Sequence, residues 1–342
     1  MVPFSSRWIA VTILVFSAIL GKDFGRQHLE YSAMHTTPSG LPEFDVNRPL
    51  PICGRWKETM PKQRDVNAYH IYMRARRLWH SNFEYLLSKD SLASVLRDVS
   101  TAAQLGDWGA QATLSDFYIH GLGHLEVNKT LEPDSFKAVE IYRAAVAAGQ
   151  AWGFFNLGVA YEYGYGDLTM DTKIAWAYYL KAAELGSPEA QMALAQAYLE
   201  AKRWDAATLM QMCAYKQGHG PAAEALGMQA EVHRRYEEAL RFYQDGVRFG
   251  NKDCANALWI FFDEGAWKGL SPEVQLERKV LGLIPDSARR KRYREIALAL
   301  EVDPDLRFAQ IDKFLPMPPA PLPAWRGIDD AVEPMSEAPP TY

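Results

Sequence analysis

Five glycines, spaced 43, 37, 32 and 32 residues apart, are each surrounded by the same pattern of residue types. A small residue follows each glycine by four positions and a leucine follows by eight. In four of the five units an aromatic residue follows by twelve, and an alanine precedes four of the glycines by eleven. The glycines are Gly106, Gly149, Gly186, Gly218 and Gly250. Apolar residues at this helical spacing predict pairs of short amphipathic helices. One such pair cannot bury both of its faces, so the repetition predicts a stack of helix pairs.

The unit at residues 151–186 shows the pattern most fully. Two segments, WGFFNLGVAYEYG and KIAWAYYLKAAELG, are joined by a loop that contains glycine and aspartate. Small residues alternate with large apolar ones in both segments, which lets two helices approach closely. The motif is carried by Leu157, Gly158, Tyr161, Gly164, Gly166, Asp171, Lys173, Ala175, Tyr178, Tyr179, Lys181, Ala182, Ala183 and Gly186.

This motif resembles the SEL-one-like repeat, a relative of the tetratricopeptide repeat. The resemblance covers roughly residues 65–285 and implies an all-α fold, a right-handed α-solenoid of helix hairpins whose first helices line a concave face. The third and fourth units depart from the motif, because their loops near residues 201–204 and 234–237 are short and lack glycine.

Changes in composition and the positions of proline and glycine predict six segments along the 342 residues. The expected second helix of the last repeat pair is SPEVQLERKVLGL, residues 271–283, and the basic helix after it is expected to expose a solvated charged face. The segments are a signal peptide or membrane anchor (1–27), an irregular strap across the first repeat (28–64), a degenerate capping helix pair (65–106), the SEL-one-like repeats (107–285), a basic C-terminal helix (286–303) and a proline-rich tail (304–342).

The N-terminal segment predicts export from the cytoplasm. Arg7 precedes an uncharged apolar run of 13 residues, Trp8 to Leu20, which is short for a membrane span and typical of a signal-peptide core. The cleavage motif is poor, so the mature protein is expected in the periplasm, either soluble after cleavage or anchored in the inner membrane. The N-terminal segment therefore meets that membrane at least during export.

Three cysteines fit an exported protein that does not depend on a disulfide scaffold. Cys213 and Cys254 occupy repeat positions where small residues pack, which favours a core-filling role. Cys53, in the strap, could pair with either of them, and the spacing does not decide between the two.

The search for catalytic chemistry is negative. The sequence contains no phosphate-binding loop, no nucleophile elbow and no zinc-protease motif. His120 and His124 have a spacing that could suit a metal, but the repeat pattern already explains the loop that holds them. We therefore predict a binding protein that is not an enzyme, with no cofactor and no metal. The net charge of −5 gives no indication of nucleic-acid binding.

The tetratricopeptide register places five positions of each first helix, 3, 6, 10, 13 and 14 residues after the marker glycine, on the concave face. Of these 25 positions nine are Asp or Glu and none is Lys or Arg. Carboxylates beside apolar anchors predict a groove for a basic protein partner. The alternative is that the apolar residues pack internally and the acids are merely solvated. The candidate binding residues are Asp116, Trp152, Phe155, Glu162, Tyr163, Glu189, Met192, Gln196, Glu200, Glu224, Met228, Glu231, Asp263 and Glu264.

The overall layout, with its export signal, strap, degenerate repeats and proline-rich tail, is similar to that of periplasmic immunity proteins encoded beside phospholipase effectors of the type VI secretion system. The resemblance is to those that face phospholipase D-type lipases. It implies that the chain binds and neutralises such an effector in the periplasm. A periplasmic adaptor or scaffold for an envelope or secretion complex is the alternative.

Overall fold

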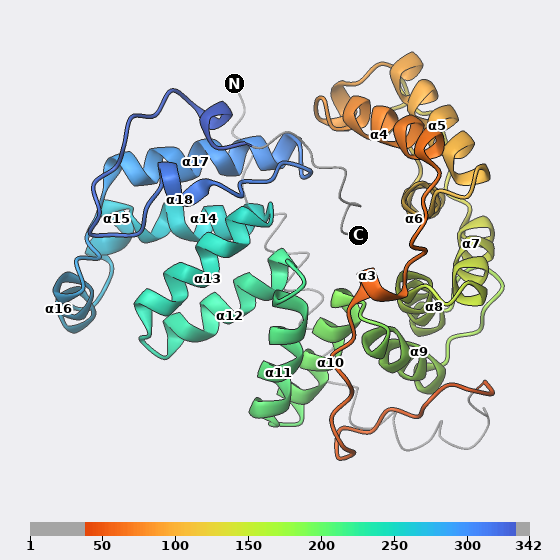
Figure 1. Cartoon of the computed structure of the whole chain (residues 1–342), viewed down its shortest axis with the longest axis horizontal. Helices are drawn as coiled ribbons and strands as arrows, with labels where there is room; N and C mark the ends of the chain where they lie inside the picture. Colours follow the sequence, from red (N-terminus) through yellow and green to blue (C-terminus); the bar gives the residue numbers. More distant parts are fainter. Residues whose placement is uncertain (1–37, 333–342) are drawn as a thin grey trace.

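A computed structural model describes residues 38–332, which form consecutive helix pairs arranged in an arc (Figure 1). From α4 to α14 each helix packs against the next in the chain, so the described residues form an α-solenoid. They contain 16 α-helices and no strand, only an isolated bridge between Leu122 and Leu131. The helices are α3 (Trp56–Thr59), α4 (Val66–Trp79), α5 (Lys89–Gln104), α6 (Trp108–His120), α7 (Ser135–Ala147), α8 (Ala151–Tyr163), α9 (Thr172–Glu184), α10 (Pro188–Glu200), α11 (Trp204–Tyr215), α12 (Gly220–Val232), α13 (Tyr236–Arg248), α14 (Lys252–Phe261), α15 (Glu264–Lys268), α16 (Pro272–Val280), α17 (Ser287–Val302) and α18 (Ile311–Phe314), with 3-10 turns η1 (Glu84–Leu86) and η2 (Ile328–Asp330).

The marker glycines end the second helix of each pair. All five have positive φ, between 73° and 99°, a region that glycine enters without steric cost. The chain then reverses directly into the next first helix, which usually begins at a capping side chain. Asp107, Ser187 and Asn251 each accept a hydrogen bond from a backbone N–H of the helix that follows. The glycine register of the sequence is therefore the register of these reversals.

The other repeated positions form the core between the helices of each pair. The alanines eleven residues before the glycines, Ala138, Ala175, Ala207 and Ala239, are fully buried. The leucines eight residues after the glycines are all buried as well. Small and large residues thus alternate at the helix contacts, as close packing of short helices requires.

The two short turns that lack glycine hold other residues in the left-handed region. Lys202, between α10 and α11, has φ of 60°, and Arg234, between α12 and α13, has φ of 59°. In both turns the following residue donates to the carbonyl near the end of the first helix, Arg203 to Tyr198 and Arg235 to Ala230. Hydrogen bonding thus closes these turns without the glycine that longer loops use.

The capping pair expected at residues 65–106 consists of α4 and α5. Asp65 caps α4, and the helix ends at Trp79. Ser81 donates to the carbonyl of Leu78, and η1 follows before Ser88 caps α5. Serine and asparagine after Trp79 compete for backbone hydrogen bonds, which explains why the helix ends there.

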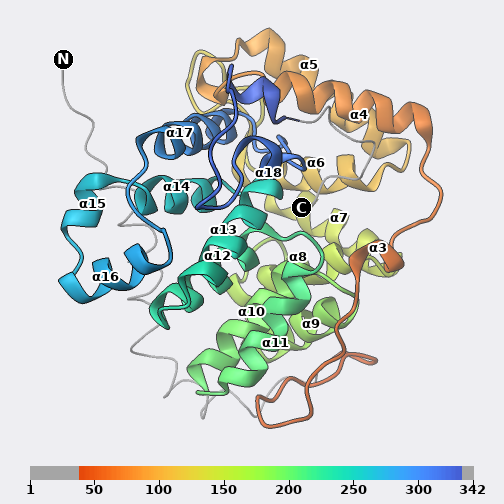
Figure 2. The same cartoon turned by 60° about the vertical axis from the view of Figure 1, so that its left-hand side comes forward.

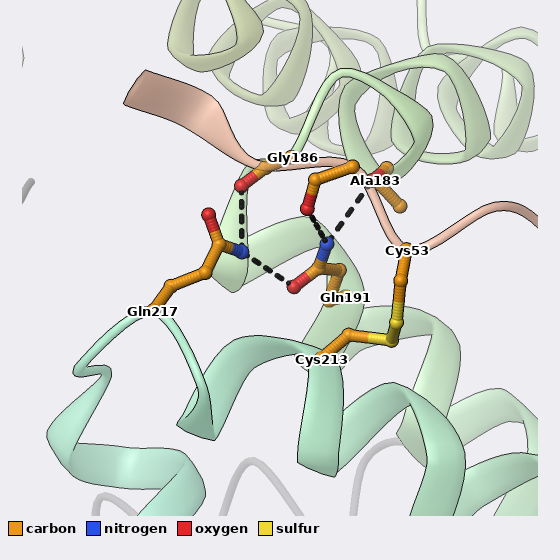
Figure 3. Close-up of a disulfide and its surroundings, with 7 residues drawn as sticks. Cys53, Ala183, Gly186, Gln191, Cys213 and Gln217 are labelled. Atoms are coloured by element: carbon orange, nitrogen blue, oxygen red, sulfur yellow. Dashed lines mark hydrogen bonds between the residues drawn. A yellow bond between two sulfur atoms is a disulfide. The ribbon is translucent and has the colours of Figure 1, made fainter. Parts of the chain in front are cut away.

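The strap takes a different path from the one the sequence suggested. We expected it across the first repeat, but residues 43–56 lie against α9, α10 and α11. Phe44 stacks on Trp176 at a centroid distance of 5.0 Å, and Arg203 donates to the carbonyl of Val46. Cys53 forms a disulfide with Cys213 of α11 (Figure 3). Cys254 is free and buried. Cys213 is therefore a cross-link and not only a core filler.

Two glutamines bind the strap and the repeat reversals together beside this disulfide. Gln191 donates to the carbonyls of Gly54 and Ala183, and Gln217 donates to Gln191 and to the carbonyl of Gly186 (Figure 3). The backbone of residues 55 and 56 lies so close to Gly186 that a Cβ atom there would clash with it. The strap is thus fixed to the middle of the solenoid by both covalent and polar contacts.

The two ends of the solenoid meet. In both views the end of α4 lies near the end of α17 (Figure 1 and Figure 2). Arg76 of α4 donates from Nε and Nη2 to the two carboxylate oxygens of Asp305, at 2.5 and 2.6 Å, across 229 residues of sequence. His80 Nδ1 lies 2.9 Å from the same carboxylate. We call these three residues the clasp.

The last helix pair consists of α14 and α17, not of α14 and residues 271–283. The intervening α16 instead lies against the α12–α13 turn, where Arg234 pairs with Glu273 and Glu277. The arginine-rich sequence of α17 suggested an exposed helix outside the repeat pairs. Two of its arginines are instead buried, and the helix packs as the partner of α14.

Arg289 and Arg292 of α17 hold the proline-rich tail. Arg289 donates to the carbonyls of Pro316 and Ala320, and Arg292 donates to those of Phe314 and Pro323. Proline offers a carbonyl but no N–H, so a proline-rich segment is matched by a residue that carries several donors and no acceptor. The expectation of a solvated basic face was therefore wrong for these two residues.

Trp325 completes the attachment of the tail. Its Nε1 donates to Glu295 at 2.6 Å, and its ring lies edge-on to Phe314. Within residues 38–332 no helix is long and apolar enough to cross a lipid bilayer. The expected leader, residues 1–27, and the end of the tail beyond residue 332 lie outside the described residues.

Candidate protein-binding surface

The candidate binding residues lie on α6, α8, α10 and α12 and at the start of α15, which follows α14. Helices α6, α8, α10, α12 and α14 are the first helices of successive pairs. We call the exposed side of these helices the first-helix face. Tyr163 and Met228 are 55% and 56% exposed there. Asp116, Gln196, Glu200 and Glu264 are also exposed, whereas Phe155, Glu162, Glu189, Met192, Glu224, Glu231 and Asp263 are half-buried.

Trp152 does not belong to this face. Its side chain is only 1% exposed, and its Nε1 donates to Gln150 at 2.6 Å. It lies in the first turn of α8, in the core cluster that also contains Ala145 of α7. The start of a first helix packs against the preceding second helix, so the third position after the glycine points inward in this unit.

Two further apolar residues of the same register are more exposed than most of the selected ones. Val232 at the end of α12 is 78% exposed, and Ile260 of α14 is 53% exposed. Together with Tyr163 and Met228 they place a large apolar side chain on three of the five first helices. Such residues, surrounded by carboxylates, are what a protein partner would cover.

Several of the acids are already satisfied by neighbours on their own helix. Asp116 lies 3.0 Å from His120 Nδ1, Glu200 accepts from Gln196, and Glu264 pairs with Lys268. Asp263 caps α15 and pairs with Arg290 of α17 at 2.6 Å. These local contacts support the solvated interpretation for this group of acids.

Glu162 and Glu231 differ, because each is bound by a tyrosine of the paired second helix. Tyr179 OH donates to Glu162 Oε2 at 2.5 Å, and Tyr243 OH donates to Glu231 Oε2 at 3.1 Å. Burial, followed by the charge of the neighbouring glutamate, raises the pKa of both tyrosines, so both hydroxyls stay protonated and donate.

A glycine makes this contact possible in both units. A Cβ atom on Gly158 would lie 2.7 Å from the Tyr179 ring, and one on Gly227 would lie 2.5 Å from the Tyr243 ring. The sequence places each glutamate four residues after its glycine. We name the two sets the Glu162 module (Gly158, Glu162, Tyr179) and the Glu231 module (Gly227, Glu231, Tyr243).

Two other carboxylates on this face, Glu189 and Glu224, are largely shielded from solvent. Burial raises the pKa of Glu189 to about 7, and its Oε1 atom accepts no hydrogen bond among residues 38–332. His219 Nδ1 lies 4.0 Å from that oxygen, but burial lowers the pKa of His219 to about 4, so the imidazole is neutral at pH 7. Burial, with the charge of Asp253, also raises the pKa of Glu224.

The described residues bring together one set with metal-ligand chemistry, His80, Asp303 and Asp305. The set does not suit a cation, because Arg76 already occupies both oxygens of Asp305 and would repel a metal there. Although burial opposes it, hydrogen bonds from His80 and Arg76 hold the pKa of Asp305 well below its usual range. His120 and His124 each lie beside a different acid, Asp116 and Glu84.

A cavity of about 200 Å³ lies where the clasp meets the reversals before α12 and α14. Its lining includes Arg76, His219, Asn251, Asp305 and Arg307. The charged groups there are engaged with one another or with the backbone, as Arg307 is with the carbonyls of Pro304 and Leu306. The first-helix face is therefore the better candidate site.

Comparisons with known proteins give one match to a family model and several similar solved structures. The sequence model of a domain of unknown function, DUF6396, matches residues 262–341, and no curated protein matches the chain. The structure resembles that of immunity protein Pa5087 from Pseudomonas aeruginosa, with 27% identity, coverage of 79% of this chain and 95% of that chain, and a TM-score of 0.62.

Two further solved structures from the same organism are similar to an equal degree. Pseudomonas aeruginosa 5086 (PA5086) shares 27% identity over 80% of this chain and 97% of that chain, with a TM-score of 0.63. Immunity protein PA5088 shares 27% identity over 80% of this chain and 96% of that chain, with a TM-score of 0.60. The chain is thus an α-solenoid that resembles immunity proteins of Pseudomonas aeruginosa over about four fifths of its length.

Proposed function

We propose that this chain is an immunity protein that binds and neutralises a phospholipase D-type effector of the type VI secretion system in the periplasm. The observation that carries the proposal is the similarity, along almost the full length of each relative, to solved structures of which two are described as immunity proteins. The effector class and the compartment come from the layout of the sequence.

Two features of the structure support the compartment and the mode of action. The disulfide between Cys53 and Cys213 suits an oxidising compartment such as the periplasm. The first-helix face offers apolar anchors among carboxylates, and no Lys or Arg occupies its register positions. Phospholipase D-type sites bind phosphate through His and Lys, so an acidic face has the charge needed to cover one.

The proposal is tested by protection of cells. A phospholipase D-type effector from the same genome, directed to the periplasm of a test strain, should kill cells unless this chain is co-expressed with its leader. In vitro, the purified chain should stop the release of choline from phosphatidylcholine vesicles by that effector. Protection that is absent against every such effector, together with an envelope defect in an effector-free deletion strain, would favour the adaptor alternative.

The binding face is tested by a matched pair of exposed aromatic residues. Tyr163→Ser removes an anchor of the first-helix face, whereas Phe136→Ser removes a side chain of second helix α7 that is 61% exposed. We expect Tyr163→Ser to weaken effector binding by about tenfold or more and Phe136→Ser to leave it unchanged. Equal losses, or a loss only with Phe136→Ser, would assign binding to a different face.

A further inference from the structure

The Glu162 and Glu231 modules have the same internal geometry but different surroundings. In both, a tyrosine hydroxyl occupies Oε2 of the glutamate and leaves Oε1 free of the module's own contacts. The Glu231 module carries a cation on Oε1, which the chain itself supplies. This occupied copy shows what chemistry the arrangement accepts.

The cation on the Glu231 module is Arg278 of α16. Its Nη2 donates to Glu231 Oε1 at 2.6 Å, and its side chain is 6% exposed. The guanidinium carbon lies 4.0 Å from the centroid of the Phe261 ring and 4.7 Å from that of Tyr236. Arginine suits such a site because its planar group stacks on aromatic faces while one edge donates to a carboxylate.

The Glu162 module has the same acceptor without the cation. Within residues 38–332, Glu162 Oε1 accepts no hydrogen bond and Glu162 forms no ion pair. Tyr163, the next residue, offers an aromatic ring to the partner, because it is 55% exposed. Burial and the nearby charge of Glu162 raise the pKa of Tyr163. The ring of Phe155 lies 5.5 Å from that of Tyr179. Among the described residues, the helices that pack closely against α8 are α7 and α9, and neither supplies an ion-pair partner to Glu162.

We propose that the Glu162 module is a receptor for an arginine side chain of the protein partner, with the guanidinium on Glu162 Oε1 and against the ring of Tyr163. The identity of that partner rests on the proposed function, but the affinity of the module for a guanidinium does not. In the Glu231 module, Arg278 of α16 already occupies the equivalent site. The Glu162 module is therefore the open arginine site that the partner meets on the first-helix face.

The chemistry is tested with N-acetyl-arginine amide, added to the purified protein up to about 100 mM and followed by the backbone amide resonances of residues 155–180. We expect saturable shifts there. N-acetyl-citrulline amide, which has the same shape without the charge, should give none, and N-acetyl-lysine amide should bind several-fold more weakly because ammonium is more strongly hydrated and does not stack. No shift with the arginine compound, or equal shifts with lysine, overturns the assignment.

Glu162→Gln tests the site directly, since the amide oxygen still accepts from Tyr179 and the fold is kept. Arginine binding should weaken by about tenfold, because a charge-assisted contact becomes a neutral one. Glu140→Gln, an exposed glutamate on second helix α7, is the matched control and should bind as the unmodified protein does. Binding that survives in Glu162→Gln contradicts the proposal.

Arg278→Met gives a test by gain of function. Removing the built-in guanidinium frees Glu231 Oε1, so shifts caused by the arginine compound should now appear around residues 228–245 as well. Their absence would show that the module has no affinity for a guanidinium. Failure of arginine binding refutes this inference and leaves cell protection untouched, whereas failure of protection refutes the proposed function and leaves arginine binding intact.

Discussion

The repeated pairs α6–α13 and the segments that join distant parts of the chain are held together by different interactions. The pairs are joined by buried alanines and leucines that recur at fixed positions. The long-range connections use polar and covalent contacts, namely the Cys53–Cys213 disulfide and the clasp. Local stacking and overall closure are thus separate properties of this molecule.

This difference has a physical reason. Nearest-neighbour stacking needs only apolar surface at helical spacing, and each unit satisfies it independently. Joining residues that are more than a hundred positions apart costs loop-closure entropy, which a few strong, directional contacts must offset. Removing a long-range connection should therefore cost more than altering one residue within a repeat, and the three predictions below test that ranking.

The largest effect is expected for the disulfide, which closes a loop of 160 residues. Cys53→Ala should lower the free energy of unfolding by about 5 kcal/mol, the value that loop-closure entropy gives for a loop of this size. Denaturant unfolding measures it, with and without dithiothreitol. The unmodified protein should lose the same stability on reduction, while Cys53→Ala should not respond.

Cys254→Ala is the control for this experiment. Cys254 is free and buried, so its replacement should cost only a small packing term and should leave the response to dithiothreitol intact. Mass analysis of an unreduced digest should find the peptide of Cys53 joined to that of Cys213. A peptide joined to Cys254 would refute the pairing, and an insensitive unmodified protein would refute the ranking.

The clasp should have the next largest effect. Arg76→Met leaves Asp305, which is 6% exposed, without its bidentate partner, and losing one member of a buried ion pair costs about 4 kcal/mol. Arg74→Met on the same helix is the matched control, because the Arg74–Asp98 pair has its arginine 66% exposed and should contribute less than about 1 kcal/mol. Similar losses in the two variants would mean that closure of the solenoid adds no stability.

The sequence predicted the repeated part of the fold and missed most of the long-range connections. The glycine register was readable because each marker glycine occupies a backbone conformation that other residues avoid. Nothing periodic marks Arg76, Asp305 or Cys213 as partners of distant residues. Arg289 and Arg292 were misread because a run of charges looks solvated unless the carbonyls it binds are known.

The same limits apply to the binding face. The register placed Glu162 and Tyr163 on a first helix, where the structure has them half-buried and exposed. It could not separate Trp152, which packs inward, from the exposed positions, because that depends on how closely the preceding helix approaches. The two modules do carry a signal in the sequence, a glycine four residues before a glutamate and a tyrosine on the next helix, but the positions of the acids alone do not reveal it.

The smallest of the three effects concerns Glu189, a half-buried carboxylate within the repeats. Its pKa is raised by burial from 4.5 to about 7, so the folded state binds its proton more tightly than the unfolded state does. The contribution to stability is therefore full below pH 4.5 and is lost as pH rises to about 7, by about 3 kcal/mol in total. Glu189→Gln removes the charge, keeps an acceptor for Ser187, and should flatten this part of the pH profile while raising stability at pH 7.5. Unfolding curves between pH 4.5 and 7.5 decide the point, with Glu140→Gln as the exposed control. A profile that keeps its slope in Glu189→Gln would place the titration elsewhere, and the repeats would then depend on apolar packing alone.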